Sequence, residues 1–348
     1  MILLQALRLL ILTSISFIVA FGAAQLWLRV MERWRIGKQI RTSDETPVFS
    51  SLHQKKVGTP TGAGVIVWGT VALLAVVFFL LSIFFDGFWK FFNFVNRAET
   101  YLPLAALLIA ALVGLADDWL GSLRIGGGNG GGIKVRYKLI IYTVIAAIGA
   151  LWFYYRLDWD VLSVPFLGNF FVGAWYIPIF MFIIIASAFS SNETDGLDGL
   201  LGGVALFAFT ALMIVAFALH RYDLAVFCGT MTGALLAFIW FNIYPARFFM
   251  GDTGSMSIGI VIGVVAMLTN TTLFLPFFAL ILVLESASVI IQVISKKLRG
   301  GKKVFLSSPL HHHFEALGWP ESQVTMRFWI ISAIGVGMGL VLFFLSRL

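Results

Sequence analysis

Two carboxylates three residues apart interrupt an otherwise apolar part of the chain. After an apolar run over 174–189, the segment S-S-N-E-T-D-G-L-D-G-L (190–200) places Asp195 and Asp198 near Asn192. A carboxylate at a membrane boundary is costly unless it has a partner or a task. Residues three apart share one face of a helical turn, and carboxylate oxygens suit Mg²⁺. The segment favours cation or phosphate binding over the alternative, a simple helix N-cap.

Two more acidic motifs follow the same logic. Asp117 and Asp118 end an apolar run in G-L-A-D-D-W, where acids at a helix C-terminus oppose the helix dipole. They suit a divalent cation or a general base, and the alternative is a solvated helix end. Asp252 lies between glycines in F-F-M-G-D-T-G-S (248–255), at an expected helix N-terminus that would attract phosphate. A helix cap is again the alternative there.

Basic residues gather in two further loops. Histidine can bind a metal or an anionic oxygen, and lysine and threonine complement phosphate. A positively charged loop that only sets membrane orientation is an equally good explanation for the lysines. The residues are His311, His312 and His313 in P-L-H-H-H-F-E (309–315), and Lys56 and Thr61 in H-Q-K-K-V-G-T-P-T (53–61). A further acid, Glu285, lies inside an apolar run, where we expect it to hold helix packing.

The elements that carry these motifs are membrane-spanning helices. The chain has 348 residues, of which 60% are hydrophobic and 12% charged, whereas a soluble domain has about 25% charged residues. The apolar residues occur in runs of about 20, the length that crosses the hydrocarbon as a helix. We therefore expect one integral all-α polytopic membrane domain over 1–348. The ten expected spans are 3–28, 62–85, 101–116, 138–155, 174–190, 199–219, 224–241, 255–270, 272–294 and 327–346.

The net charge of +7 is explained by loops that face the cytoplasm and by contact with anionic lipid, so we do not expect nucleic-acid binding. Of the 24 Lys and Arg residues, 18 fall in or beside one alternating set of loops and six fall in the other set and the termini. The first set is therefore assigned to the cytoplasm, with both termini outside. Every motif described above, apart from the intramembrane Glu285, belongs to that set. On the other side, we expect a short hairpin within 157–172.

Carboxylates, lysines and histidines at one membrane boundary suit a diphosphate substrate held by Mg²⁺. A lipid-linked phosphate as the nucleophile would explain why such chemistry takes place in a membrane. A cation-coupled transporter is the main alternative, but transporter sites typically lie near the bilayer midplane on broken helices. A purely structural membrane protein is the weakest alternative.

The order of the motifs resembles a known enzyme family. D-D-W, N-x-T-D-G-L-D-G, M-G-D-T-G-S and P-L-H-H-H-F-E-x-x-G-W are similar to those of the polyprenyl-phosphate N-acetylhexosamine-1-phosphate transferases. The H-Q-K-K-x-G-T-P-T and P-L-H-H-H-F-E segments resemble the phospho-N-acetylmuramoyl-pentapeptide-transferase branch. The resemblance implies ten helices, a homodimer, and transfer of phospho-MurNAc-pentapeptide from its UDP carrier to undecaprenyl phosphate in the bacterial inner membrane, releasing UMP. A sibling transferase that uses UDP-N-acetylglucosamine remains the alternative.

The resemblance also implies roles for single residues. It makes Asp252 the Mg²⁺ ligand and assigns Asp117 and Asp118 to positioning or deprotonating the lipid phosphate. Asn192, Asp195 and Asp198 would line the nucleotide and diphosphate pocket, with Asn242 and Phe249 toward the uracil. Lys56, Thr61 and Lys138 would contact phosphates or ribose, and the three histidines would close the site. The chain departs from the family pattern at Gly121, where Lys is common, and at Glu193, where an apolar residue is common.

Overall fold

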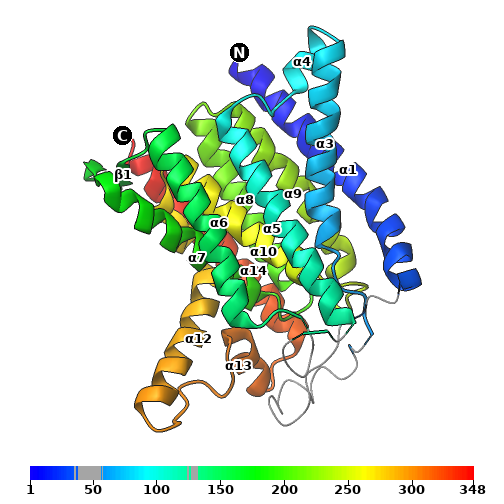
Figure 1. Ribbon diagram of the computed structural model, residues 1–348, viewed down its shortest axis with the longest axis vertical. Coiled ribbons are helices and arrows are strands. Elements are labelled where there is room, and N and C mark those ends of the chain that lie inside the picture. Colours follow the sequence, from blue (N-terminus) through cyan, green and yellow to red (C-terminus); the bar gives the residue numbers. More distant parts are fainter. Residues whose placement is uncertain (35–36, 38–55, 57, 124, 127–131) are drawn as a thin grey trace.

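The computed structural model describes residues 1–34, 37, 56, 58–123, 125–126 and 132–348. Within these ranges the chain forms a bundle of long helices with a few short elements at its ends (Figure 1). The long helices are α1 (Ile2–Trp34), α3 (Gly64–Phe84), α5 (Ala98–Ser122), α6 (Val135–Arg156), α7 (Tyr176–Thr194), α8 (Leu200–Ala218), α9 (Tyr222–Asn242), α10 (Gly251–Leu268), α12 (Leu280–Leu298) and α14 (Glu321–Leu345). The short elements are α4 (Phe88–Phe92), η2 (Gly173–Trp175), η3 (Thr272–Phe274), α11 (Leu275–Phe278), α13 (Leu310–Ala316), β1 (Val161–Val164) and β2 (Gly168–Phe171).

The helices confirm an all-α, multi-pass membrane fold. In the described ranges, nine helices are long and apolar enough to cross a membrane, and a tenth crossing is formed if one bent pair counts as a single span. That pair joins 272–278 to α12 with a bend of 91°. The sequence predicts a span over 272–294, and the structure covers this range with the bent pair rather than with one unbroken helix. The backbone of Ala279 (φ −125°, ψ 38°) leaves the helical region and breaks the run.

The expected hairpin is confirmed at the end of the bundle that carries both termini in Figure 1. Strands β1 and β2 are antiparallel, with Val161 opposite Phe171 and Val164 opposite Gly168. The side chain of Asn270, just beyond α10, holds the hairpin in place. It accepts a hydrogen bond from the Ser163 backbone N–H at 2.9 Å and donates one to the Val161 carbonyl at 3.2 Å.

Helix α10 lies in the centre of the bundle and packs against α3, α5, α7 and α8. Small residues permit this close packing. A Cβ added at Gly64 would overlap the backbone of Gly254, and one added at Gly114 would overlap the carbonyl of Asp252. The backbone of α10 is therefore held by direct contact with its neighbours, and its first turn has a fixed position.

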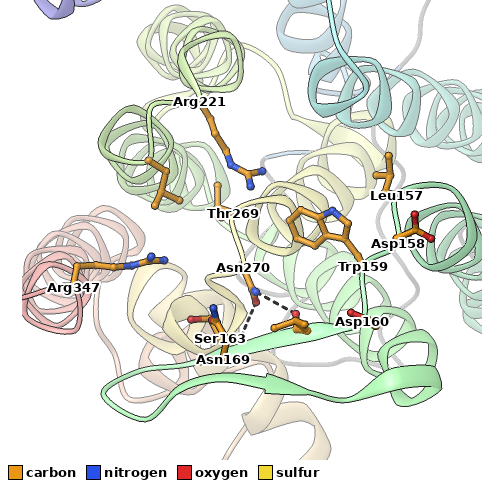
Figure 2. A pocket seen from close by; sticks show the side chains of 12 residues that line it. Leu157, Asp158, Trp159, Asp160, Ser163, Asn169, Arg221, Thr269, Asn270 and Arg347 are labelled. Atoms are coloured by element: carbon orange, nitrogen blue, oxygen red, sulfur yellow. Dashed lines mark hydrogen bonds between the residues drawn. The ribbon is translucent and has the colours of Figure 1, made fainter.

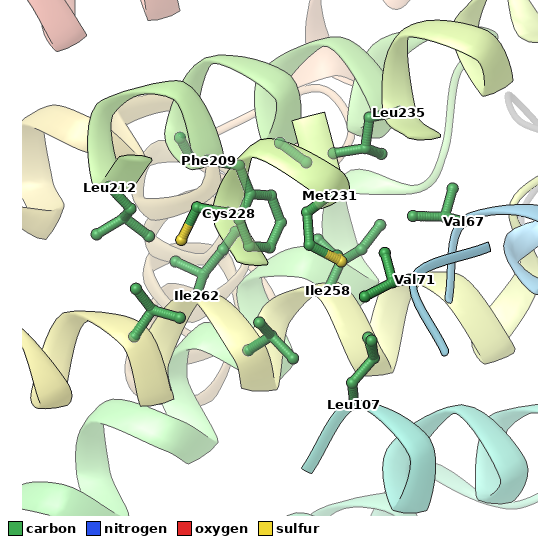
Figure 3. Close-up of a cluster of buried hydrophobic side chains, with 14 of the residues drawn as sticks. Val67, Val71, Leu107, Phe209, Leu212, Cys228, Met231, Leu235, Ile258 and Ile262 are labelled. Carbon is green, nitrogen blue, oxygen red and sulfur yellow. The ribbon is translucent and has the colours of Figure 1, made fainter. Parts of the chain in front are cut away.

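The apolar core joins five helices. Figure 3 shows side chains from α3, α5, α8, α9 and α10 packed together in one cluster. The labelled members are Val67, Val71, Leu107, Phe209, Leu212, Cys228, Met231, Leu235, Ile258 and Ile262. By contrast, α1 and α14 expose large apolar side chains such as Leu10, Ile18 and Ile334. Such faces are stable against lipid tails rather than water.

Candidate active site

Three helix ends bring a lysine and two carboxylates into contact. Lys138, in the first turn of α6, lies with its Nζ 2.7 Å from an Oδ2 of Asp117 and 2.8 Å from an Oδ2 of Asp252. Asp117 belongs to the last turns of α5, and Asp252 to the first turn of α10. The two carboxylates therefore converge on a single cationic group. We call Asp117, Lys138, Asn192 and Asp252 the central group.

The end of α7 contributes an amide to the same place. The side-chain nitrogen of Asn192 donates to an oxygen of Asp252 at 2.5 Å and to the hydroxyl of Ser255 at 3.0 Å. Both carboxylate oxygens of Asp252 thus have a donor, one from Asn192 and one from Lys138. The hydrogen bonds fix the orientation of the Asp252 carboxylate before any ligand binds.

Asp118 has a different task from Asp117. Its two carboxylate oxygens accept hydrogen bonds from the backbone N–H groups of Asp252 and Thr253, both at 3.0 Å. These N–H groups belong to the unsatisfied first turn of α10. Gly251, which precedes them, has φ +73°, and a side chain there would also approach Asp118 closely. Asp118 is therefore the cap of α10, supplied by a residue 134 positions earlier in the chain.

A second group of charged side chains surrounds Lys56. Its Nζ lies 2.6 Å from an oxygen of Asp198 and also pairs with Glu321, at the start of α14. The ammonium is 5.7 Å from the centre of the Phe249 ring, within reach of a cation–π contact. Asp198 has further partners, because its second oxygen accepts the backbone N–H of Ala246 at 2.9 Å. We call Lys56, Asp198 and Glu321 the lysine group.

The third group contains two buried ionisable side chains. The ring Nδ1 of His311 lies 3.0 Å from an oxygen of Glu285, and both side chains are almost fully buried. The sequence suggested that Glu285 holds helix packing, and the structure shows that it holds α13 through His311. The other ring nitrogen of His311, Nε2, is buried against Gly196 and has no hydrogen-bond partner among the described residues. A Cβ at Gly196 would overlap it.

Residues 195–199, which we call the junction segment, contact all three groups. Asp195 accepts the backbone N–H of Gly251 at 3.2 Å, next to the central group. Gly196 packs on His311, and Asp198 pairs with Lys56. Neither acid is the N-cap of α8, because that position is Gly199, whose backbone N–H is accepted by the side chain of Asn242 at 3.0 Å. The helix-cap alternative for Asp195 and Asp198 therefore does not account for these acids.

Several residues that were predicted to bind substrate form hydrogen bonds within the protein. Asn242 accepts the Gly199 N–H at 3.0 Å and donates to the Phe248 carbonyl at 2.8 Å. His312 bonds to Glu315 at 2.6 Å, and His313 accepts the Leu306 N–H at 3.2 Å. These contacts show structural roles, and the expected contacts with uracil or phosphate stay predictions.

Thr61 lies where the described loop meets the start of α10. The carbonyl of Pro60 accepts the Phe249 N–H at 2.8 Å, and the carbonyl of Phe249 accepts the Ala63 N–H at 3.0 Å. This pairing holds the backbone on both sides of Thr61 alongside Phe249, just before the first turn of α10. Residues 53–55 and 57 of the predicted phosphate-binding segment lie outside the described residues.

Sequence reasoning missed two polar partners. Glu321 pairs with Lys56 and accepts the backbone N–H of Asp198 at 2.7 Å. The Ser255 hydroxyl accepts a hydrogen bond from the side-chain nitrogen of Asn192 at 3.0 Å. Glu321 carried one usable signal, because it is an isolated acid in the same set of loops as the other motifs. Ser255 carried none beyond its place in M-G-D-T-G-S.

The oxygens of the central group fit a magnesium ion. In the described part of the chain, no three His, Cys, Asp or Glu side chains form a metal-ligand set. Mg²⁺ is commonly held by one or two carboxylates together with water and substrate phosphates. Asp252 and Asp117 supply two such oxygens that already face one cation. The donor set therefore suits a metal that the substrate helps to bind, rather than a closed protein cage.

Comparison with known proteins finds relatives along nearly the whole chain. Residues 100–270 match the profile described as Glycosyl transferase family 4. The chain is 36% identical to the phospho-N-acetylmuramoyl-pentapeptide-transferase of Chloroflexus aggregans, over 97% of this chain and 90% of that protein. It is also 36% identical to the enzyme of that name from Geobacillus thermodenitrificans, over 94% of this chain and 95% of that protein. The chain belongs to the phospho-N-acetylmuramoyl-pentapeptide-transferase family.

Membership assigns this chain to the membrane transferases. The matched range 100–270 contains all of the central group and the junction segment, while Lys56, Glu321 and His311 lie outside it. The near full-length similarity to the family covers those residues too. The transferase thus combines a centre inside the shared range with flanking groups on either side of it.

Proposed function

We propose that this transferase moves phospho-MurNAc-pentapeptide from UDP-MurNAc-pentapeptide to undecaprenyl phosphate, releasing UMP in a Mg²⁺-dependent reaction. The observation that carries the proposal is the convergence of Asp117 and Asp252 on Lys138 at one end of a membrane bundle. Carboxylates at that place suit a diphosphate with its metal, and the apolar helices suit a lipid acceptor. The family name supports the choice of donor.

In the proposed reaction, an oxygen of the lipid phosphate attacks the phosphorus attached to the sugar. The bond between that phosphorus and the bridging oxygen breaks, and UMP leaves with the electron pair. A phosphate monoester has a second pKa near 6 and is largely dianionic at pH 7. Because this nucleophile needs little activation, we favour direct attack over a covalent aspartyl intermediate.

Each residue of the site has its own role in the proposed reaction. Asp252, with Asp117 beside it, would hold Mg²⁺, which when bound would neutralise charge on the diphosphate. Lys138 would shift from the carboxylates toward a phosphate oxygen, and Lys56 would act in the same way on the other side of the junction segment. Asp118 positions the first turn of α10, because both of its oxygens are occupied by backbone donors.

We also propose that this end of the bundle faces the cytoplasm of a bacterial cell. Eighteen of the 24 Lys and Arg residues lie in or beside the loops on that side. A UDP-linked donor is soluble and would arrive from the cytosol. Because the resemblance to the family implies a homodimer, we include a homodimer in this proposal.

A transporter is disfavoured by the position of the break in the bent pair. Transporter sites are commonly built on broken helices near the midplane. In this chain the break at Ala279 is flanked by the apolar residues Phe278 and Leu280. The charged side chains of the central group lie at helix ends and not at this break.

A donor assay tests the proposal. The purified protein in lipid nanodiscs is given undecaprenyl phosphate, Mg²⁺ and either UDP-MurNAc-pentapeptide or UDP-N-acetylglucosamine, and UMP release is measured. UMP from the first donor alone is expected. Release from the second donor alone would establish the sibling transferase instead. If neither donor reacts, a cation flux in liposomes would revive the transporter.

A further inference from the structure

Figure 2 shows a cavity of about 420 Å³, which lies at the opposite end of α10 from the central group. It is bounded by the ends of α6, α8, α10 and α14 and by the β1–β2 hairpin. Asp252 begins α10, whereas Thr269 and Asn270, which line the cavity, follow its last turn. Because α10 has 18 residues, the two places are about 27 Å apart. The cavity therefore takes no part in the proposed transfer.

The charged side chains of the cavity are separated by sign. Figure 2 shows Arg221 and Arg347 on one side and Asp158 and Asp160 on the other, with the ring of Trp159 between them. A ligand with only negative charge would face the two carboxylates, and one with only positive charge would face the two guanidinium groups. A ligand that carries both charges a few bonds apart would meet an opposite charge on each side.

The protein itself leaves part of this charge unpaired. Arg221 is held firmly, because it donates to the Leu268 carbonyl at 2.5 Å, pairs with Glu99 at 3.2 Å and stacks 5.5 Å from the Trp159 ring centre. Among the described residues, no ion pair includes Asp158 or Asp160. The guanidinium of Arg347 contacts the ring of Phe343. The cavity thus has an arginine held in place on one side and, on the other, two carboxylates that form no ion pair within the described residues.

The position of the cavity indicates the class of ligand. The cavity lies where several membrane spans end, and the exposed rings of Trp175, Phe170 and Phe171 are close by in the chain. Aromatic side chains of this kind mark the headgroup level of a bilayer. A volume of about 420 Å³ falls within the usual range for small-molecule sites.

We propose that this cavity binds a phosphoethanolamine group, with its phosphate toward Arg221 and Arg347 and its ammonium toward Asp158 and Asp160. An ammonium can donate three hydrogen bonds to carboxylates. The quaternary ammonium of a choline group can donate none, and a glycerol headgroup carries no positive charge. The group can come from a phospholipid in the bilayer or from a free phosphoethanolamine ester. The inference does not depend on the proposed transfer reaction.

Native mass spectrometry of the full-length protein tests the site. Phosphatidylethanolamine, phosphatidylcholine and phosphatidylglycerol with identical acyl chains are titrated separately. Phosphatidylethanolamine is expected to bind roughly fivefold more tightly than either of the others, the scale of one exposed ion pair. Soluble glycerophosphoethanolamine is the second arm. If glycerophosphoethanolamine binds weakly, the source of the group is the phospholipid. If it binds as tightly as phosphatidylethanolamine, the source is the free ester.

Variants connect the preference to the two walls. The double variant Asp158→Asn with Asp160→Asn should lower phosphatidylethanolamine affinity to that of phosphatidylcholine. Arg347→Gln should weaken all three lipids, because each carries a phosphate. Asp86→Asn is the matched control, since this carboxylate is 91% exposed and pairs only with Lys90 among the described residues. If the double variant does not fold, Asp158→Asn alone gives the same comparison. Equal binding of the three lipids, or an unchanged preference in a folded carboxylate variant, overturns the proposal.

Discussion

The carboxylate of Asp118 accepts a hydrogen bond from the backbone N–H of Asp252 at 3.0 Å, so one acid of the site holds the helix end that carries another. The same carboxylate also accepts the N–H of Thr253. Four acids of similar appearance in the sequence therefore have unequal roles. Asp118 is bound to backbone, Asp195 and Asp198 connect loops, and Asp252 presents its oxygens to Lys138 and Asn192.

Replacing Asp118 should lower stability more than replacing Asp252. Asp118→Ala leaves two N–H groups of the first turn of α10 without acceptors, at a cost of about 2 kcal/mol or more. The midpoint of thermal unfolding in detergent is therefore expected to fall clearly for Asp118→Ala and little for Asp252→Ala. Equal losses in the two variants would contradict the division of roles.

Replacing Asp252 should abolish Mg²⁺-dependent UMP release while the protein stays folded. Removal of a group that holds charge in the transition state typically costs about 10²–10³ in rate. Turnover by Asp252→Ala is measured in membranes, with Asp86→Ala as the control, because the Asp86 carboxylate is exposed and lies between α3 and α4. Retained turnover would remove the assignment of Asp252 to the metal.

Replacing Lys138 should lower the rate because the carboxylates of Asp117 and Asp252 then face each other without a positive charge between them. Lys138→Met keeps the length of the side chain and removes the charge, and a loss of about 100-fold in kcat is expected. Lys90→Met is the matched control, because Lys90 is exposed and pairs with Asp86. A kcat near the wild-type value would assign Lys138 to helix packing only.

Gly196→Ala should displace α13 and disable the enzyme. The added Cβ would overlap Nε2 of His311, which is held from its other side by Glu285. Loss of UMP release and a lower unfolding midpoint are expected together. Gly337→Ala is the control, since its Cβ meets nothing within 4 Å and alanine favours a helix. If Gly196→Ala behaves like Gly337→Ala, the packing of His311 on the junction segment is unimportant.

Glu321→Gln should raise the KM for the UDP-linked donor more than it lowers kcat. Glu321 holds both Lys56 and the Asp198 N–H, so its loss loosens a lysine that we assign to phosphate binding. A rise in KM of roughly fivefold is expected, the scale of one ion pair. Lys56→Met should show a larger change in the same direction. A drop in kcat with constant KM would instead place Glu321 near the reacting atoms.

Hydropathy predicted most of the fold. Runs of about 20 apolar residues located the spans, and β1 and β2 form the hairpin expected within 157–172. The bend at Ala279 was not predictable from these runs, because residues on both sides of it are apolar and one continuous run hides a change of direction. A turn between polar loops leaves a signal in composition, whereas a break inside hydrocarbon does not.

The candidate site was predicted as a set of residues but not as a set of contacts. The motifs named Asp117, Asp118, Asn192 and Asp252, and the structure brings them together. The cap that Asp118 provides joins residues 134 positions apart, and local helix-cap rules consider only neighbours. The pairing of Lys56 with Glu321 spans 265 positions and depends on how α14 meets the junction segment.

The junction segment also bears on how donor preference could evolve in such an enzyme. Five consecutive residues contact the Asp252 side, the Lys56 side and the His311 side of the site at once. A substitution within them that suited a new sugar would disturb all three sides together. New donor choice is therefore expected to arise from the surrounding loops, through changes that enlarge or narrow the entrance while these five residues persist.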